Sequence, residues 1–153
     1  MDMISKNTKK RYESGLYDNF IEIVNNRPSE IVKKHLMVAV TMLRRDLTKR
    51  QLNIIQLISM LSLLYGNETC IMPKLQDFEM CGVSKTLVNK ELTKLVDLGI
   101  ITWVKENNTN IFSINDITEW KAPHHYGYSE TRATEIYGLN LRYLYEVKGN
   151  LPK

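Results

Sequence analysis

Apolar residues recur at intervals of three and four along several stretches of the chain, which is the spacing of one face of an α-helix. The first stretch predicts a helix over about residues 29–45, with Ser29 as its N-cap. The face expected to point inward consists of Val32, Leu36, Ala39, Val40 and Leu43.

A second helix is predicted over about residues 48–65. Thr48 and Gln51 fit a capping box, and Leu47 and Leu52 fit the hydrophobic staple that accompanies it. The stretch is apolar on nearly every side and is followed by Gly66, a typical residue just past a helix end. We therefore expect this helix to be buried against several neighbours.

The middle of the chain then alternates short elements. Residues 68–72 predict a brief strand, residues 74–81 a short helix, and residues 81–83 a tight turn. Ser84 is the expected cap of another helix that ends near Gly99, with an inward face formed by Val88, Leu92, Leu95 and Val96.

Two strands are predicted next, at residues 100–105 and 110–114. The turn between them contains Asn107 and Asn108, and because asparagine tolerates positive φ, a hairpin fits this spacing. Residues 121–128 predict a loop, and Ser129 caps a final helix to about residue 147, which Gly138 weakens in its middle.

These elements suggest three regions. Residues 1–15 are polar and basic and predict a flexible arm. Residues 16–120 are expected to form the main domain, which begins with a short apolar segment at 16–24. Residues 121–153 are expected to add a loop, a helix for packing or dimerisation, and a free tail at 149–153. The expected fold class is mainly α with a small β-hairpin.

Composition and charge narrow the class of protein. Of the 153 residues, 43% are hydrophobic and 25% are charged, which is ordinary for a globular domain and excludes a disordered chain. Residues 1–50 hold 11 Lys and Arg against 6 Asp and Glu (net +5), residues 51–100 hold 4 against 5 (−1), and residues 101–153 hold 6 against 6 (0). The positive charge is therefore confined to one third of the chain.

Several functional classes find no support in the residues. There is no signal-peptide pattern and no apolar run of the length that a membrane span needs, so a soluble, cytoplasmic protein without membrane contact is expected. Cys70 and Cys81 are interpreted as small hydrophobic residues, because their spacing to each other and to His124 and His125 resembles no metal-ligand motif. No catalytic motif is recognisable, so we expect neither an enzyme nor a cofactor or metal.

The order helix, strand, short helix, turn, capped helix and hairpin is that of a winged helix-turn-helix. Residues 75–92 (LQDFEMCGVSKTLVNKEL) resemble the helix-turn-helix pattern in which Gly-Val-Ser opens the recognition helix, and residues 97–101 (DLGII) resemble its entry into the wing. One departure is Phe78, which stands where the family usually has alanine. It either separates the two helices or is accommodated in the core.

A closer resemblance covers about residues 20–120. The segments 46–52 (DLTKRQL) and 64–66 (LYG), together with the helix-turn-helix and wing, are similar to the amino-terminal winged-helix domain of phage replication initiators of the lambda O type, and in outline to primosomal proteins of the DnaD type. This resemblance implies origin recognition and recruitment of helicase-loading machinery. The part after the domain is shorter than in such initiators.

The candidate DNA-binding residues follow from the geometry of a recognition helix in the major groove. Lys85, Thr86, Asn89 and Lys90 are expected to face DNA, with Asn89 suited to adenine, either lysine to guanine or phosphate, and Leu87 or the Thr86 methyl group to thymine. Backbone or wing contacts are expected from a second group: Lys94, Lys49, Arg50, Lys105, Asn107, Asn108 and Asn110.

The leading hypothesis is sequence-specific binding of double-stranded DNA in phage or mobile-element replication, with a helicase or helicase loader as a partner. A transcriptional regulator and a winged helix that binds only protein are the alternatives. Five of the eight tyrosines follow residue 125. They could stack on the bases of single-stranded nucleic acid, but packing against the domain or a partner subunit is the preferred interpretation. Because large apolar faces are rarely left uncovered, a homodimer built through helices 29–45 and 129–147 is also predicted.

Overall fold

A computed structural model of the chain describes residue 25 and residues 28–148. The predicted basic arm, the apolar segment 16–24 and the tail 149–153 lie outside the described residues. The chain divides into two compact units after Pro123.

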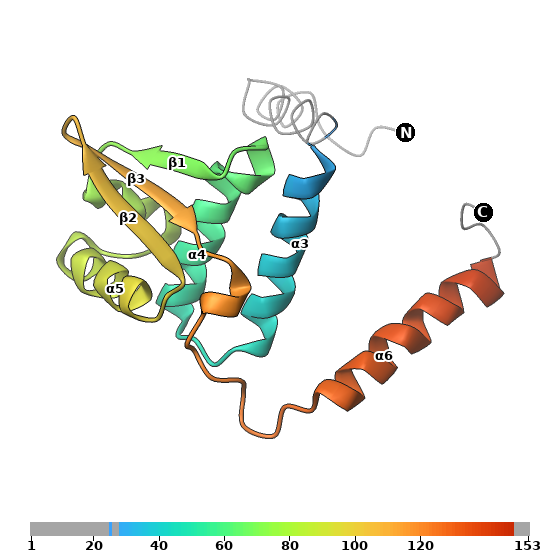
Figure 1. The fold of residues 1–153 in the computed structure, drawn as a ribbon. Coiled ribbons are helices and arrows are strands. Elements are labelled where there is room, and N and C mark those ends of the chain that lie inside the picture. Colours follow the sequence, from blue (N-terminus) through green and yellow to red (C-terminus); the bar gives the residue numbers. More distant parts are fainter. Residues whose placement is uncertain (1–24, 26–27, 149–153) are drawn as a thin grey trace, which may run out of the picture. The chain divides into compact units, whose positions relative to one another are not determined.

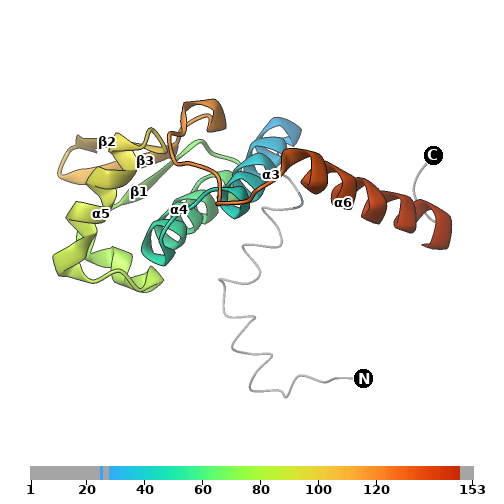
Figure 2. The ribbon, with the colours of Figure 1, turned by 90° about the horizontal axis from the view of Figure 1, so that it is seen from below.

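The first unit is organised around a central helix, α4. This helix spans Lys49–Leu61 and packs against α3 (Ser29–Arg44), α5 (Lys85–Asp97) and the sheet. Figures 1 and 2 show α3 on one side of α4 and the sheet with α5 on the other. The central position predicted for this helix is confirmed by the complete burial of Ile54, Ile55 and Ile58.

The capping box that opens α4 is present. The Gln51 backbone N–H donates to Thr48 Oγ1 over 3.2 Å, and the Thr48 backbone N–H donates to Gln51 Oε1 over 2.9 Å. The start of α3 differs from prediction by one residue, because Pro28 is its N-cap and Ser29 is the first helical residue. Proline fits there since its φ is already fixed near the helical value.

The far end of α4 comes earlier than predicted. The α-helix stops at Leu61, and a 3-10 helix, η1 (Leu63–Tyr65), continues to Gly66. At the junction the buried Ser62 hydroxyl donates to the Ile58 carbonyl over 2.6 Å. A serine bond of this kind favours bending and competes with the regular helix, which explains the shorter element.

Three short strands form an antiparallel sheet in the order β1-β3-β2. They are β1 (Thr69–Met72), β2 (Ile101–Glu106) and β3 (Thr109–Ile114). Asn107 and Asn108 have φ values of 51° and 62°, which confirms the predicted hairpin turn. The brief strand at 68–72 is the third member of the sheet, so the wing is a hairpin paired with β1.

The helix-turn-helix segment begins with a 3-10 helix, η2 (Leu75–Cys81), rather than an α-helix. Gly82 follows it at φ 86°, a conformation that other residues rarely adopt, and Val83 is fully buried beyond it. The Asn53 side-chain amide donates to the Cys81 carbonyl over 3.0 Å, so α4 holds the turn in place.

A second glycine has a steric requirement at the entry to the wing. Gly99 has a φ of 71°, and a Cβ built on it lies 2.4 Å from the Glu119 carbonyl oxygen. The segment that follows β3 therefore packs directly over Gly99. It includes a short 3-10 helix, η3 (Ile117–Glu119).

The core accommodates Phe78, the residue that departs from the family pattern. Its side chain is fully buried, and its ring meets Phe112 of β3 edge to face with centroids 5.4 Å apart. Of the two alternatives stated for this residue, burial in the core is the one observed.

The inward face predicted for α3 is wrong at three of its five residues, while Val32 and Val40 are partly buried. Leu36 is 58% exposed, Leu43 is 70% exposed and Ala39 is also exposed. The buried residues are Val38 and Thr41, and the Thr41 hydroxyl is satisfied by donating to the Met37 carbonyl of its own helix over 2.7 Å.

The second unit contains α6 (Glu130–Tyr143), followed by a single π-helical segment, η4 (Leu144–Lys148). Ser129 caps α6 as predicted, because its hydroxyl accepts from the Arg132 backbone N–H over 3.1 Å. No residue of α6 is buried. Its exposed apolar side chains are Ile136, Tyr137, Leu139, Leu141 and Tyr143.

The observed architecture is mainly α with a β-hairpin wing, and its elements follow one another in the predicted winged helix-turn-helix order. Within residue 25 and residues 28–148, none of the helices has the length and apolar character needed to cross a bilayer.

Candidate nucleic-acid interface

The outer face of α5 carries the residues predicted to read DNA. Lys85, Thr86, Asn89 and Lys90 are all exposed, and Leu87 beside them is partly buried. Because residues three and four apart share a helix face, these side chains form one polar surface over the first two turns. Lys94 is exposed one turn further on.

The opposite face of α5 is fixed in the core. Val88 is 2% exposed, and Leu92 and Leu95 are fully buried. Val96, also predicted to point inward, is 39% exposed instead. Leu95 occupies the buried position at the end of the helix, and α5 also packs against β2. The polar surface of α5 is thus presented by a helix that the core holds firmly.

The start of α5 differs in detail from the predicted cap. Ser84 is the N-cap residue, but its side chain makes no capping hydrogen bond to the helix backbone. Its hydroxyl oxygen lies instead 3.1 Å from Thr86 Oγ1, at hydrogen-bond distance. The two hydroxyls therefore pair at the edge of the predicted reading surface.

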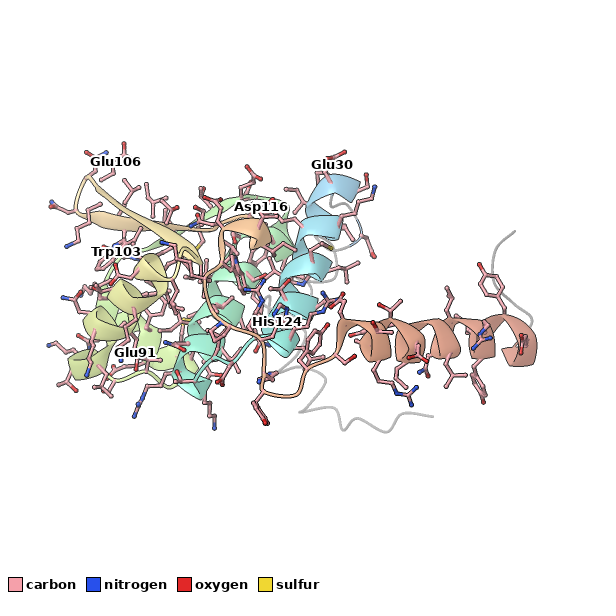
Figure 3. All side chains as sticks on the ribbon, turned by 60° about the horizontal axis from the view of Figure 1, so that its bottom comes forward. Glu30, Glu91, Trp103, Glu106, Asp116 and His124 are labelled. Carbon is pink, nitrogen blue, oxygen red and sulfur yellow. The ribbon has the colours of Figure 1, made fainter. Side chains whose placement is uncertain are left out.

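Lys49 and Arg50 occupy the exposed first turn of α4. Arg50 has a neighbour that the sequence analysis did not anticipate. Its Nη1 lies 4.0 Å from Oε2 of Glu91, whose side chain is only 9% exposed. Figure 3 labels Glu91 on α5, where the recognition helix adjoins α4.

The wing holds three of the predicted residues at its exposed end, namely Lys105, Asn107 and Asn108. The Lys105 ammonium lies 5.1 Å from the ring centroid of Trp103, a cation–π contact that limits where this charge can go. Trp103, labelled in Figure 3, in turn stacks on Phe112 with centroids 5.7 Å apart. Among the described residues, no hydrogen bond or ion pair joins these three wing residues to α5.

Asn110 was predicted to extend the polar reach of the wing, and this is wrong. Asn110 is 8% exposed. Its Oδ1 accepts from the Trp103 indole N–H over 3.0 Å, and its Nδ2 donates to the Met72 carbonyl over 3.1 Å. The amide joins all three strands, so its role is to hold the wing together.

The two cysteines lie in apolar surroundings. Burial raises the pKa of the Cys70 thiol to about 11 and also raises the pKa of Cys81 above its ordinary value. The Cys81 Sγ lies 3.2 Å from the Phe78 carbonyl oxygen, to which it donates. In the part of the chain that the structure describes, no three His, Cys, Asp or Glu side chains gather in a way that could hold a metal ion.

Sequence reasoning missed two side chains that support this surface, Asn53 and Glu91, and it gave a third, Asn110, the wrong role. Each is a polar residue at a position that its helix or strand turns toward a neighbouring element. A buried polar group needs a partner, so an inward polar position was the available signal.

Comparison with protein families gives a match that covers most of the chain. The model for bacteriophage replication protein O matches residues 18–120, which include α3, α4, the helix-turn-helix and the wing. Comparison with curated proteins and with solved structures finds no match. Since the matched region covers most of the chain and ends after the wing, the chain belongs to the bacteriophage replication protein O family.

Proposed function

We propose that this protein initiates phage DNA replication by binding a specific duplex DNA sequence through α5. The observation that carries the proposal is the division of α5 into two faces. Lys85, Thr86, Asn89 and Lys90 are exposed on one face, while Val88 and Leu92 are buried on the other. A helix held in this way is suited to the major groove.

The exposed side chains suggest a division of labour. Asn89 suits bidentate contact with adenine, Lys85 or Lys90 suits guanine, and the Thr86 methyl group or Leu87 suits the methyl group of thymine. A second group is expected to contact the sugar-phosphate backbone and thereby set the register: Lys49, Arg50, Lys94, Lys105, Asn107 and Asn108.

The experiment that tests this assignment compares two substitutions on the same helix. Asn89→Ala is expected to weaken binding to the preferred site by about 1–3 kcal/mol and to relax base preference, whereas Lys94→Ala is expected to weaken all sequences equally. Site selection from a random duplex pool, followed by titration of both variants, measures the difference. Equal losses on all sequences for Asn89→Ala would show that α5 does not read bases.

The salt dependence of wild-type binding tests the proposal at a coarser level. Each phosphate contact is expected to contribute a slope of about −0.9 to a plot of log K against log salt concentration. Titration of a labelled duplex over a range of salt concentrations gives this slope. Absent or salt-insensitive binding would favour the alternative of a winged helix that binds only protein.

The proposal extends to assembly. The exposed apolar side chains of α3 and of α6, including Leu43 and Tyr137, support a homodimer in which these helices meet a second copy. Light scattering or sedimentation on the intact chain and on a chain ending at Pro123 is the test. We choose Pro123 because the Ala122 and Pro123 carbonyls accept from Arg45 Nη1 and the Asp46 backbone N–H over 2.7 and 2.8 Å, so an earlier end would damage the first unit.

Recruitment of a helicase or helicase loader is the remaining part of the proposal. Its support is the same set of unburied apolar residues on α6 together with the family. A dimer that persists in the shortened chain would leave α6 free for such a partner. A monomeric intact chain would contradict the homodimer and leave recruitment as the use of this helix.

A further inference from the structure

The first turn of α4 contains two adjacent cations and no acidic residue. The N-terminus of a helix carries a partial positive charge, so Lys49 and Arg50 are both unfavourable for the helix itself. Charged side chains at such a position need another reason to be there. The two residues differ in what surrounds them.

Arg50 faces a buried carboxylate across the contact between two helices. Its side chain is 55% exposed, and its Nη1 lies 4.0 Å from Oε2 of Glu91, whose side chain projects from α5 and is 9% exposed. Lys49 is also exposed, but among the described residues no ion pair of Lys49 is found within the same distance limit. One cation therefore has an acidic neighbour on the recognition helix, and the other has none there.

Glu91 is in a position that makes this pairing consequential. It follows Asn89 and Lys90 of the proposed reading surface, and it precedes the buried Leu92. A carboxylate that is nearly buried without a compensating charge is costly and tends to move toward water. Such a movement would disturb the neighbouring reading residues, and it would bring a negative charge toward the phosphates.

We propose that Arg50 is a positioning residue, which acts on DNA binding by holding α5 through Glu91, whereas Lys49 makes a phosphate contact. The inference rests on the proposed function and revises one part of it, because Arg50 then acts through a protein carboxylate rather than as a phosphate ligand. The two neighbouring cations have different roles.

Salt dependence separates the two roles. Loss of a phosphate contact reduces the slope of log K against log salt by about 0.9, whereas loss of a positioning residue lowers affinity and leaves the slope in place. Arg50→Ala is thus expected to weaken specific binding about tenfold with an unchanged slope. Lys49→Ala is the matched control, and it is expected to reduce the slope.

Coupling to Glu91 provides the second readout. In a Glu91→Gln background the carboxylate charge is gone, so adding Arg50→Ala is expected to cost less than about twofold. Arg50→Lys keeps a cation at this place and is expected to recover part of the lost affinity. A general effect of net charge would make the effects of Arg50→Ala and Glu91→Gln on affinity additive.

The full-length protein is used for all variants, and melting curves confirm that each is folded. A reduced slope for Arg50→Ala, or the same loss with and without Glu91→Gln, would overturn the proposal. If Arg50→Ala fails to fold, the effect of Arg50→Lys on affinity is compared in the wild-type and Glu91→Gln backgrounds instead. If the wild type binds no DNA, the proposed function fails, and amide chemical shifts of α5 in Arg50→Ala still test positioning: unchanged shifts would contradict it.

Discussion

The two compact units treat their apolar residues in opposite ways. In the described part of the first unit, side chains from α3, α4, α5, η2 and the sheet reach complete burial, among them Ile54, Phe78 and Phe112. In α6 no residue is buried, although Tyr137, Leu139 and Leu141 are as apolar as many core residues. Similar residue types are therefore used for folding in one unit and left available in the other.

This difference indicates where stability resides and where binding can occur. Burial of apolar surface is the main favourable term in folding, so the first unit carries the free energy of unfolding. The exposed residues of α6 contribute little to it and can contribute to an interface instead. The predictions that follow test this contrast, beginning with the largest expected effect.

Phe78→Ala is expected to lower the free energy of unfolding by about 3–5 kcal/mol, because it removes a fully buried ring and leaves a cavity beside Phe112. Urea denaturation followed by circular dichroism measures the change. Tyr126→Ala is the control, since Tyr126 is a fully exposed aromatic residue. Similar losses for both would mean that Phe78 is not part of a packed core.

Asn110→Ala is expected to cost about 1–3 kcal/mol, because the Trp103 indole N–H and the Met72 carbonyl lose their shared partner. Asn108 at the exposed wing tip is a neighbouring asparagine outside this network. Its φ of 62° would be strained with alanine but is readily adopted by glycine. Asn108→Gly is therefore the matched control. Thermal unfolding followed by Trp fluorescence gives the melting temperature of both variants. Equal melting temperatures for Asn110→Ala and Asn108→Gly would contradict the network.

The turn at Asn108 could be predicted from the sequence, whereas the role of Asn110 could not. The periodicity of α4, its capping box and the Asn-Asn turn are local features, and the structure confirms them. The role of Asn110 depends on β1, a strand distant in the sequence that supplies the Met72 carbonyl. An alternating pattern shows which face a residue occupies only when the register is known.

The wrong face of α3 has a related cause. Apolar residues surround this helix, so two different stripes satisfy the three- and four-residue spacing. Contacts with neighbouring elements determine which stripe faces inward. His35 Nδ1 lies 3.0 Å from the Ser59 hydroxyl of α4, and Arg45 donates to the carbonyls of Trp120 and Ala122. For the same reason, the proximity of Arg50 to Glu91 required the packing of α4 against α5 and could not be read from spacing.

Cys70 supplies a pH-dependent test of the first unit. Because burial raises the pKa of its thiol from 9.0 to about 11, the native state retains the proton that the unfolded state loses above pH 9. The free energy of unfolding is therefore expected to fall as pH rises from 9 toward 11, by about 1 kcal/mol at pH 10. Urea denaturation at pH 8 and pH 10 measures the fall, and Cys70→Ala should reduce it. An equal pH dependence in the variant would assign the fall to other groups.

The smallest effect on stability is expected from α6. The double substitution Tyr137→Ala and Leu141→Ala removes two side chains that are 54% and 55% exposed. Because the variant loses little buried surface within its own chain, its free energy of unfolding at low protein concentration should change by less than about 0.5 kcal/mol. If these residues meet a second copy, the melting temperature of the wild type will rise with protein concentration, and that of the variant will not. Thermal melts over a hundredfold range of concentration measure both quantities. A loss of several kcal/mol at low concentration would show that α6 is part of the folded core, and the contrast between the two units would then be wrong.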